Sequence, residues 1–319
     1  MTEPEDLERA VLGAVPELTG EQVAEATGLS LEQARRLWRA LGFPEAYGAS
    51  AFSTADAEAL SRVARLEHDG GLDFDTIVRM TRAVGQTMDR LAEWEVATIA
   101  SQIDREGGQV SRRAEALRLV ETIGPHFEAL LTYGWRRHLL ASIARVSGGE
   151  DLSDEQVAEA TVGFADLVSF SELTNRLGDE EIGDLVEVFE SRSQDVVSRR
   201  RGRVVKTLGD SVLFMAATPA DGVEIAWDIV RVIGGDPRLP DVRVGMVTGS
   251  VVMRMGDVYG PAVNLAARLT GVARRNRVIT DLHTAGRLPE ERYETRALPA
   301  RPVRGFGDLQ PVAVRRTTR

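Results

Sequence analysis

The feature that most constrains the fold is a short stretch in the second half of the chain, residues 203–215. It reads Arg-Val-Val-Lys-Thr-Leu-Gly-Asp-Ser-Val-Leu-Phe-Met, so two apolar or β-branched runs flank Leu-Gly-Asp. This pattern predicts a β-hairpin, because strand-forming runs joined by a short Gly-containing connection are a strong local hairpin signal. Lys206 and Asp210 lie beside and in the predicted turn. The hairpin therefore fixes two charged side chains on a rigid scaffold.

A second carboxylate ends another strand-like run. Residues 161–167 read Thr-Val-Gly-Phe-Ala-Asp-Leu and place Asp166 near the end of a predicted strand. Asp166 and Asp210 together can hold two divalent cations, because Mg²⁺ and Mn²⁺ prefer hard oxygen ligands. The chain contains no cysteine, which excludes disulfides, thiolate metal sites and cysteine nucleophiles. Metal chemistry must therefore use oxygen ligands.

Length and charge narrow the class of protein. The 319 residues give room for about two domains. The formal net charge of -10 argues against nucleic acid as the main partner, because such binding is driven largely by Lys and Arg on phosphates. No apolar run approaches the ~18 residues of a membrane span, and the acidic N-terminus is unlike a secretory signal. We expect a cytoplasmic protein without a membrane span.

The first half of the sequence, residues 1–146, predicts an all-helical domain. Residues 19–28 and 30–41 form two helical patterns around a Gly-containing turn, and the second opens with a capping box, Ser30 and Gln33. This layout also fits a helix-turn-helix DNA-binding regulator. The first fifty residues, however, carry nine acidic side chains and only four arginines, which is not the charge of a DNA-binding surface.

Two longer helical regions follow. Residues 75–103 carry Ile77, Met80, Val84, Met88 and Leu91 at spacings of three and four, which predicts a core-facing stripe. Met80 and Met88 are also compatible with a pocket for a lipid. From 111 to 146 we expect two helices broken at Gly124-Pro125, and the Gly-rich, acidic residues 147–157 predict a linker.

The second half, residues 158–319, predicts an α+β domain. The expected order is strand 160–166, helix 171–200, hairpin 203–216, helix 219–233, a strand pair within 242–255, helix 261–273, strand 278–280 and a strand pair within 304–314. This order suggests a split βαβ sandwich, with helices on one side and an antiparallel-rich sheet on the other.

These motifs resemble a known family once residues 256–268 are added. That segment reads Gly-Asp-Val-Tyr-Gly-Pro-Ala-Val-Asn-Leu-Ala-Ala-Arg, and with Asp166 and the hairpin it resembles the catalytic domain of the class III nucleotidyl cyclases over residues 158–316. Residues 36–44 and 135–140 resemble the helical domain of the soluble, pH-sensing adenylate cyclases of actinobacteria. The resemblance implies a ferredoxin-like, palm-type βαββαβ core and conversion of a nucleoside triphosphate to a 3′,5′-cyclic monophosphate and pyrophosphate.

The resemblance also implies roles for residues around the carboxylates. Asp166 and Asp210 would bind two Mg²⁺ or Mn²⁺ ions, with the backbone carbonyl of Leu167 as a further ligand. The loop that ends with Phe170 and Ser171 would offer backbone N–H groups to the phosphates. In that loop Ser169 replaces a glycine common in the family. Near the C-terminus Arg304 replaces a lysine that usually contacts the terminal phosphates.

Two further pairs would complete the site. Asn264 and Arg268 lie four residues apart, hence on one face of a helix, and the resemblance assigns Asn264 to the ribose and Arg268 to the charge that develops in the transition state. Lys206 can donate to N1 of adenine and Asp257 can accept from its N6 amine, a polarity that guanine contradicts. ATP is therefore the predicted substrate.

The family's architecture implies a homodimer and a regulatory role for the helical domain. One chain would supply Asp166 and Asp210, and the other the remaining pairs, so two-fold symmetry gives two equivalent sites. In the pH-sensing relatives the helical domain inhibits until acidification. His138, in the helix before the catalytic domain, is the best-placed proton sensor among the four histidines. The alternatives are a non-catalytic nucleotide-binding signalling module and the DNA-binding regulator.

Overall fold

The computed structural model describes residues 3–44, 51–106, 112–147, 156–254 and 256–317. The chain divides into two compact units, residues 1–142 and 143–319. The predicted linker, 147–157, lies largely outside the described residues. Among those described, no helix has the length and apolar character needed to cross a membrane.

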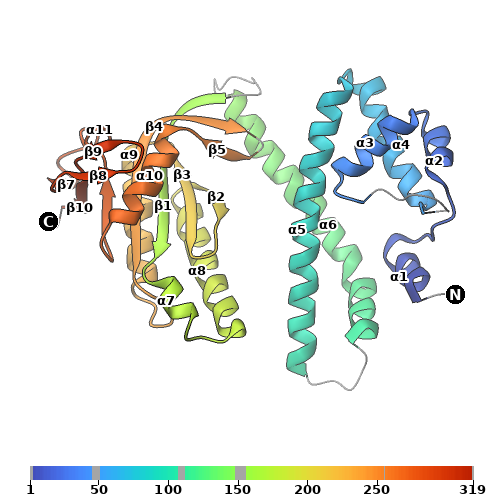
Figure 1. Ribbon diagram of the computed structural model, residues 1–319, viewed down its shortest axis with the longest axis horizontal. Coiled ribbons are helices and arrows are strands. Elements are labelled where there is room, and N and C mark those ends of the chain that lie inside the picture. The colour runs from blue at the N-terminus through green and yellow to red at the C-terminus, as the bar shows by residue number, and fades with distance from the viewer. Residues whose placement is uncertain (1–2, 45–50, 107–111, 148–155, 255, 318–319) are drawn as a thin grey trace. The chain divides into compact units, whose positions relative to one another are not determined.

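The first unit is all-helical, as predicted (Figure 1). Capping boxes formed by Thr19 with Gln22 and by Ser30 with Gln33 fix the starts of α2 and α3. A small core that includes Leu37, buried completely, joins these helices to α4 and the start of α5. The helices are α1 Glu3–Leu12, α2 Gly20–Thr27, α3 Leu31–Ala40, α4 Thr54–Gly70, α5 Phe74–Glu106 and α6 Arg112–Ser147.

The two long helices differ from the sequence prediction. The predicted break at Gly124-Pro125 is wrong, because α6 runs through Pro125 as one helix. A single proline removes one backbone donor, and the hydrogen bonds on either side of it can keep the helix continuous. The predicted core stripe on α5 is also wrong beyond its first turn, since Met80, Val84 and Met88 are 48%, 54% and 42% exposed. The small core ends at Ile77 and Val78, and a lipid ligand at the stripe stays a prediction.

The second unit is an α+β domain built on one large sheet. Its strand order is β2-β3-β1-β4-β6-β10-β7, with β5 paired to β4 and only β4 with β6 parallel. The first four strands and their helices have the βαββαβ order of the predicted ferredoxin-like core. The elements are β1 Gln156–Leu167, α7 Phe170–Thr174, α8 Asp179–Arg199, β2 Arg203–Thr207, β3 Ser211–Ala216, α9 Pro219–Ile233, β4 Val242–Arg254, β5 Asp257–Tyr259, α10 Pro261–Val272, β6 Val278–Thr280, α11 Leu282–Ala285, β7 Tyr293–Ala297, β8 Arg301–Val303, β9 Gly307–Leu309 and β10 Val312–Arg316.

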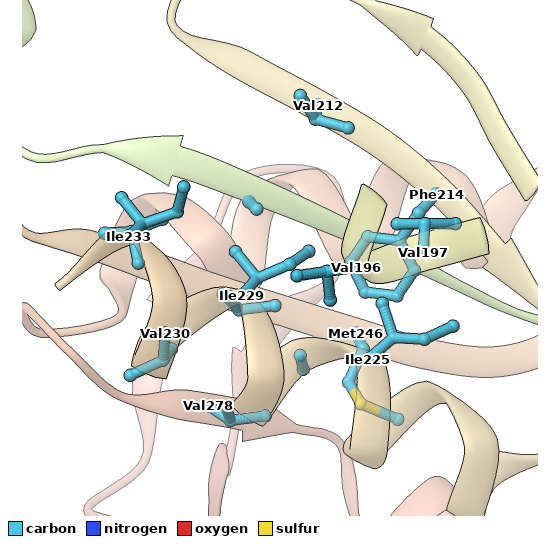
Figure 2. Close-up of a cluster of buried hydrophobic side chains, with 14 of the residues drawn as sticks. Val196, Val197, Val212, Phe214, Ile225, Ile229, Val230, Ile233, Met246 and Val278 are labelled. Atoms are coloured by element: carbon cyan, nitrogen blue, oxygen red, sulfur yellow. The ribbon is translucent and has the colours of Figure 1, made fainter. Parts of the chain in front are cut away.

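Helices cover both faces of this sheet, so the prediction of helices on one side is wrong. One core packs α8 and α9 against the strands; Figure 2 shows Val196 and Val197 beside Ile225 and Ile229 in this layer. A separate core packs α10 against the opposite face. Along β1 the side chains alternate between the two cores, as the pleat of a strand requires.

Other boundaries also differ from the prediction. The helix expected over 171–200 is divided into α7 and α8, and the strand pair expected within 242–255 is one long strand, β4, which pairs with β5. The final strand pair is not one hairpin: β10 pairs with β6 and β7, while β8 and β9 form a separate two-stranded sheet. Long-range pairing, which the local sequence pattern does not encode, decides these cases.

Candidate active site

The two predicted metal carboxylates lie at neighbouring positions of the sheet. Asp166 is on β1, opposite Ser211 of β3, and Asp210 immediately precedes that strand. The N–H of Leu167 donates to the carbonyl oxygen of Asp210 at 2.9 Å. Gly209, with φ of 65°, supplies the left-handed residue that the connection between β2 and β3 requires. The hairpin predicted from the sequence is confirmed.

The carboxylate of Asp166 acts on that of Asp210. Burial, and then the negative charge of Asp166, raises the pKa of Asp210 above its ordinary value. Such repulsion is expected where two carboxylates share one site. A cation at this place would relieve it, so the charge pattern favours a positively charged ligand.

The donor set fits a divalent cation that binds oxygen. Among the residues that the structure describes, no group of three or more His, Cys, Asp or Glu side chains could hold a metal ion. A cation at Asp166 and Asp210 would therefore complete its shell with backbone carbonyls, water or substrate oxygens. Mg²⁺ and Mn²⁺ accept such incomplete protein shells, since they retain water and bind substrate phosphates.

Sequence reasoning missed Arg243, which contacts Asp166 directly. Arg243 lies on β4 opposite Asp166, and its Nε and Nη2 lie 2.7 and 2.6 Å from Asp166 Oδ2. The available signal was a lone arginine between Val242 and Val244 in an otherwise apolar strand. Without the register of β1 on β4, however, its partner could not be named.

Lys206 and Asp257 form a second charged pair. Lys206 Nζ donates to Asp257 Oδ2 at 2.5 Å. Burial acts to raise the pKa of Asp257, but the bonds donated by Lys206 and by the N–H of Val258 outweigh it and lower that pKa. The two side chains proposed to read the base are thus together and oppositely charged.

A β-bulge in β2 turns Lys206 toward Asp257. Val204 pairs with Phe214 and Lys206 with the next residue, Leu213, so Val205 is an extra residue in β2. Phe214 faces the core under α8 and α9, whereas Leu213 faces the core under α10. In a regular strand Lys206, two residues after Val204, would share the face of Val204, because side chains alternate along a strand. The bulge at Val205 places Lys206 on the opposite face instead.

Asn264 and Arg268 lie on α10, and both are exposed. The helix approaches β4 closely at Gly245, whose N–H donates to Thr270 Oγ1 at 3.1 Å. A Cβ at Gly245 would lie 2.3 Å from the backbone nitrogen of Thr270. Glycine at this position therefore permits the helix that carries Asn264 and Arg268 to rest on the sheet.

The remaining predicted residues lie on other elements of the chain. Phe170 opens α7 and packs against the α8 and α9 core, and Ser171 follows it, exposed. Ser169 has φ of 58°, which is the left-handed region that favours glycine and explains the glycine expected there. Arg304 lies exposed in the turn between β8 and β9, and His138 is exposed on α6. Among the described residues, no hydrogen bond or ion pair joins Arg304 to another predicted site residue.

Comparison with known proteins identifies the class. A family described as the adenylate and guanylate cyclase catalytic domain matches residues 152–314. An adenylate cyclase of Streptomyces coelicolor is 42% identical over 92% of this chain and 76% of its own length. One from Glutamicibacter nicotianae is 36% identical over 96% and 80%. A pH-sensitive adenylate cyclase of Mycobacterium tuberculosis is 30% identical over 94% and 78%.

The chain belongs to the adenylate and guanylate cyclase catalytic domain family. The three relatives described above match along most of the chain and are named adenylate cyclases, so the resemblance to class III adenylate cyclases inferred from the sequence is confirmed. Members of this family bind nucleotide substrates and use divalent metals.

Proposed function

We propose that this enzyme converts ATP to 3′,5′-cyclic AMP and pyrophosphate at sites shared between two copies of the chain. The observation that carries the choice of ATP is the bulge-directed pair of Lys206 and Asp257, one donor and one acceptor side by side. Adenine presents an acceptor at N1 and a donor at N6, which matches this pair. Guanine presents a donor at N1 and an acceptor at O6. A donor would then face Lys206 and an acceptor would face Asp257, so neither hydrogen bond could form.

The reaction is an in-line displacement at phosphorus. The ribose 3′-oxygen forms a bond to the α-phosphorus, its proton passes to water, and the bond from the α-phosphorus to the bridging oxygen breaks. Pyrophosphate leaves with that electron pair. Arg268 would stabilise the charge that develops on the phosphoryl oxygens, and Asn264 would orient the ribose.

Asp166 and Asp210 would hold two Mg²⁺ or Mn²⁺ ions with the backbone carbonyl of Leu167. A cation bound there supplies Lewis-acid activation of the 3′-hydroxyl and charge neutralisation for the triphosphate. The N–H groups of Phe170 and Ser171 would position the phosphates. Arg304, on its exposed turn, would meet the terminal phosphates as a bidentate donor.

The test is product formation from ATP or GTP by the full-length chain with Mn²⁺ or Mg²⁺. We expect ATP to be strongly preferred and Asp166→Asn to remove turnover while the protein stays folded. Glu159→Gln, on the same strand but in an exposed ion pair with Arg287, should retain activity. Turnover by Asp166→Asn would contradict the metal role, and no product from either nucleotide would favour the non-catalytic binding module.

The helical domain would act as a pH-dependent inhibitor, with His138 as the candidate sensor. A pH-sensitive relative at 30% identity supports this proposal, as does the exposure of His138 on α6. We expect activity to rise on mild acidification in the full-length chain but not in residues 151–319. His138→Asn should reduce the rise, and His68→Asn, a matched change at another exposed helical histidine, should not. An equal pH response of the full-length protein and of residues 151–319 would mean that the pH dependence arises in the active site. Cytoplasmic localisation stays a prediction.

A further inference from the structure

Asn276 lies in the turn that leads into β6, outside the set of residues that the proposed mechanism uses. Its φ of 53° places it in the left-handed region, which asparagine tolerates better than most residues other than glycine. Both ends of its side-chain amide are bonded to the start of β4. We propose that Asn276 is a positioning residue of the active site, which fixes the peptide that carries the backbone carbonyl of Leu167. This inference rests on the proposed function, in which that carbonyl is a metal ligand.

Three hydrogen bonds join Asn276 to the start of β4. Asn276 Nδ2 donates to Asp241 Oδ1 at 2.6 Å, and Asn276 Oδ1 accepts from the N–H of Val242 at 3.3 Å. The backbone N–H of Asn276 donates to the carbonyl oxygen of Val242 at 2.6 Å. The bond to Asp241 is the strongest kind of the three, because its acceptor is a carboxylate. Asp241 and Asn276 are both partly buried, so water competes only in part for their bond.

Asp241 in turn holds the end of β1. The N–H of Val168 donates to the carbonyl oxygen of Asp241 at 2.7 Å, while the N–H of Leu167 donates to that of Asp210 at 2.9 Å. The chain then leaves the sheet at Ser169, which has φ of 58°. The bond to Asp241 therefore fixes the backbone at the point where the strand ends and the proposed phosphate-binding loop begins.

The N–H of Val168 and the C=O of Leu167 belong to one peptide unit. A trans peptide unit is planar, so these two groups point in opposite directions. Since the N–H points to Asp241 on the β4 side of β1, the carbonyl of Leu167 points to the β3 side. That side carries Asp210, the second proposed metal carboxylate. Rotation of this one peptide would turn the carbonyl away from Asp210, and the bond to Asp241 opposes the rotation.

A purely structural role is the competing explanation, and β4 provides a matched control. Thr284 Oγ1 accepts from the N–H of Thr248 at 2.7 Å, which is another side-chain bond to the backbone of β4. Thr248 lies opposite Thr161, well before Leu167 on β1. Thr284→Val therefore removes a buried bond to the same strand without changing the contacts at the end of β1. Asn276→Gly is the matching test variant, because glycine keeps the left-handed backbone and loses only the amide.

The first experiment measures hydrogen–deuterium exchange in the full-length protein without metal or nucleotide, by mass spectrometry with fragmentation to single residues. We expect the amide of Val168 to exchange about tenfold faster in Asn276→Gly than in the wild type, because its acceptor is held less firmly. Thr284→Val should leave the exchange of Val168 within about twofold of the wild type. An unchanged rate at Val168 in Asn276→Gly would overturn the inference.

The second experiment measures cyclic AMP formation from ATP over a range of Mg²⁺ concentrations. We expect kcat of Asn276→Gly to fall about tenfold and the half-saturating Mg²⁺ concentration to rise about fivefold, as when a residue that orients a metal ligand is lost. Asp241→Ala should have the same effect. The double variant should be no worse than either single one, because both residues act through one chain of contacts. Thr284→Val, assayed below its Tm, should keep the kcat and the Mg²⁺ dependence of the wild type.

These outcomes separate failure of this inference from failure of the proposed function. If the wild type forms cyclic AMP while Asn276→Gly keeps its kcat and Mg²⁺ dependence, Asn276 is structural only and the inference is overturned. Losses that add in the double variant would contradict the path through Asp241. If the wild type forms no cyclic AMP, the proposed function fails, and the metal role of Leu167 fails with it. If Asn276→Gly does not fold, Asp241→Ala gives both readouts and decides.

Discussion

Lys206 Nζ donates to Asp257 Oδ2 at 2.5 Å, so the two charged side chains are paired with each other. An adenine base that enters must replace this bond with one hydrogen bond to Lys206 and one to Asp257. We therefore expect the pair to matter more for substrate recognition than for folding. The side chains are 37% and 24% exposed, and ion pairs of this kind contribute about 1 kcal/mol or less to stability. Hydrogen bonds to charged groups in a formed complex are worth about 1.5–3 kcal/mol.

We therefore predict different effects of Lys206→Met on stability and on catalysis. The free energy of unfolding should fall by about 1 kcal/mol or less, whereas kcat/KM for ATP should fall by about tenfold to a hundredfold. Asp257→Asn should behave similarly, and the double variant should cost less than the sum of the two. Equal losses in stability and catalysis would show that the pair is structural.

Tyr293, whose hydroxyl donates to Glu224, gives a pH-dependent prediction of stability. Burial, and then its hydrogen bond to Glu224 at 2.8 Å, raises the pKa of Tyr293 to about 12. The raised pKa means that the folded chain keeps the phenol protonated after the unfolded chain has lost the proton. Its stabilisation is thus complete below the ordinary tyrosine pKa of about 10 and is lost as the pH rises toward about 12.

Tyr293→Phe tests this assignment. At neutral pH the variant should be less stable by about 1 kcal/mol, the value of one buried hydrogen bond. The difference between wild type and variant should shrink above pH ~10. Urea unfolding at several alkaline pH values measures it, and the phenolate absorbance of the wild type minus that of the variant locates the titration. A difference that stays constant up to pH ~12 would contradict the shift.

At the scale of elements, α10 approaches β4 closely at Gly245. Gly245 leaves no room for a Cβ, since Thr270 nitrogen and Oγ1 would lie 2.3 and 2.6 Å from it. Gly245→Ala should move α10 away from the sheet and destabilise the domain by about 1–3 kcal/mol. Activity should fall further, because α10 carries Asn264 and Arg268. Denaturant unfolding together with turnover checks both effects.

Gly271 on the same helix is the control for that change. A Cβ there would meet nothing within 4 Å, so Gly271→Ala should be neutral or stabilise by up to about 1 kcal/mol. Equal effects of the two substitutions would mean that helix propensity, and not the approach to β4, decides the result.

The sequence predicted the elements whose signals are local. The capped helices around Ser30, the hairpin at Gly209 and the strand that ends near Asp166 follow from neighbouring residues alone. It did not predict features decided by partners far along the chain: the bulge at Val205 and the pairing of Arg243 with Asp166 both depend on strand register. The continuous α6 was missed for another reason, because the rule that proline breaks helices is a tendency.

At the scale of the whole molecule, the proposed sites require two chains. One chain would supply Asp166 and Asp210, and its partner Lys206, Asp257, Asn264 and Arg268. Consider two inactive variants, one changed in the carboxylate set of the site and the other in the set supplied by the partner chain. Mixing them should restore activity, because a mixed dimer contains one site in which both residue sets are intact. Random exchange gives mixed dimers in half of the population, each with one of two sites intact.

We therefore predict that Asp166→Asn mixed with Arg268→Ala recovers about a quarter of the wild-type activity, while each variant alone is inactive. Asp166→Asn mixed with Asp210→Asn is the control: both lesions lie in the same half, so neither site of the mixed dimer is intact and no recovery is expected. The measurement is cyclic AMP formation after co-refolding, with differently tagged chains purified in tandem to show that mixed dimers formed. Mixed dimers of the first pair without activity would exclude shared sites, whereas activity in the control pair would exclude the proposed division of residues between the chains.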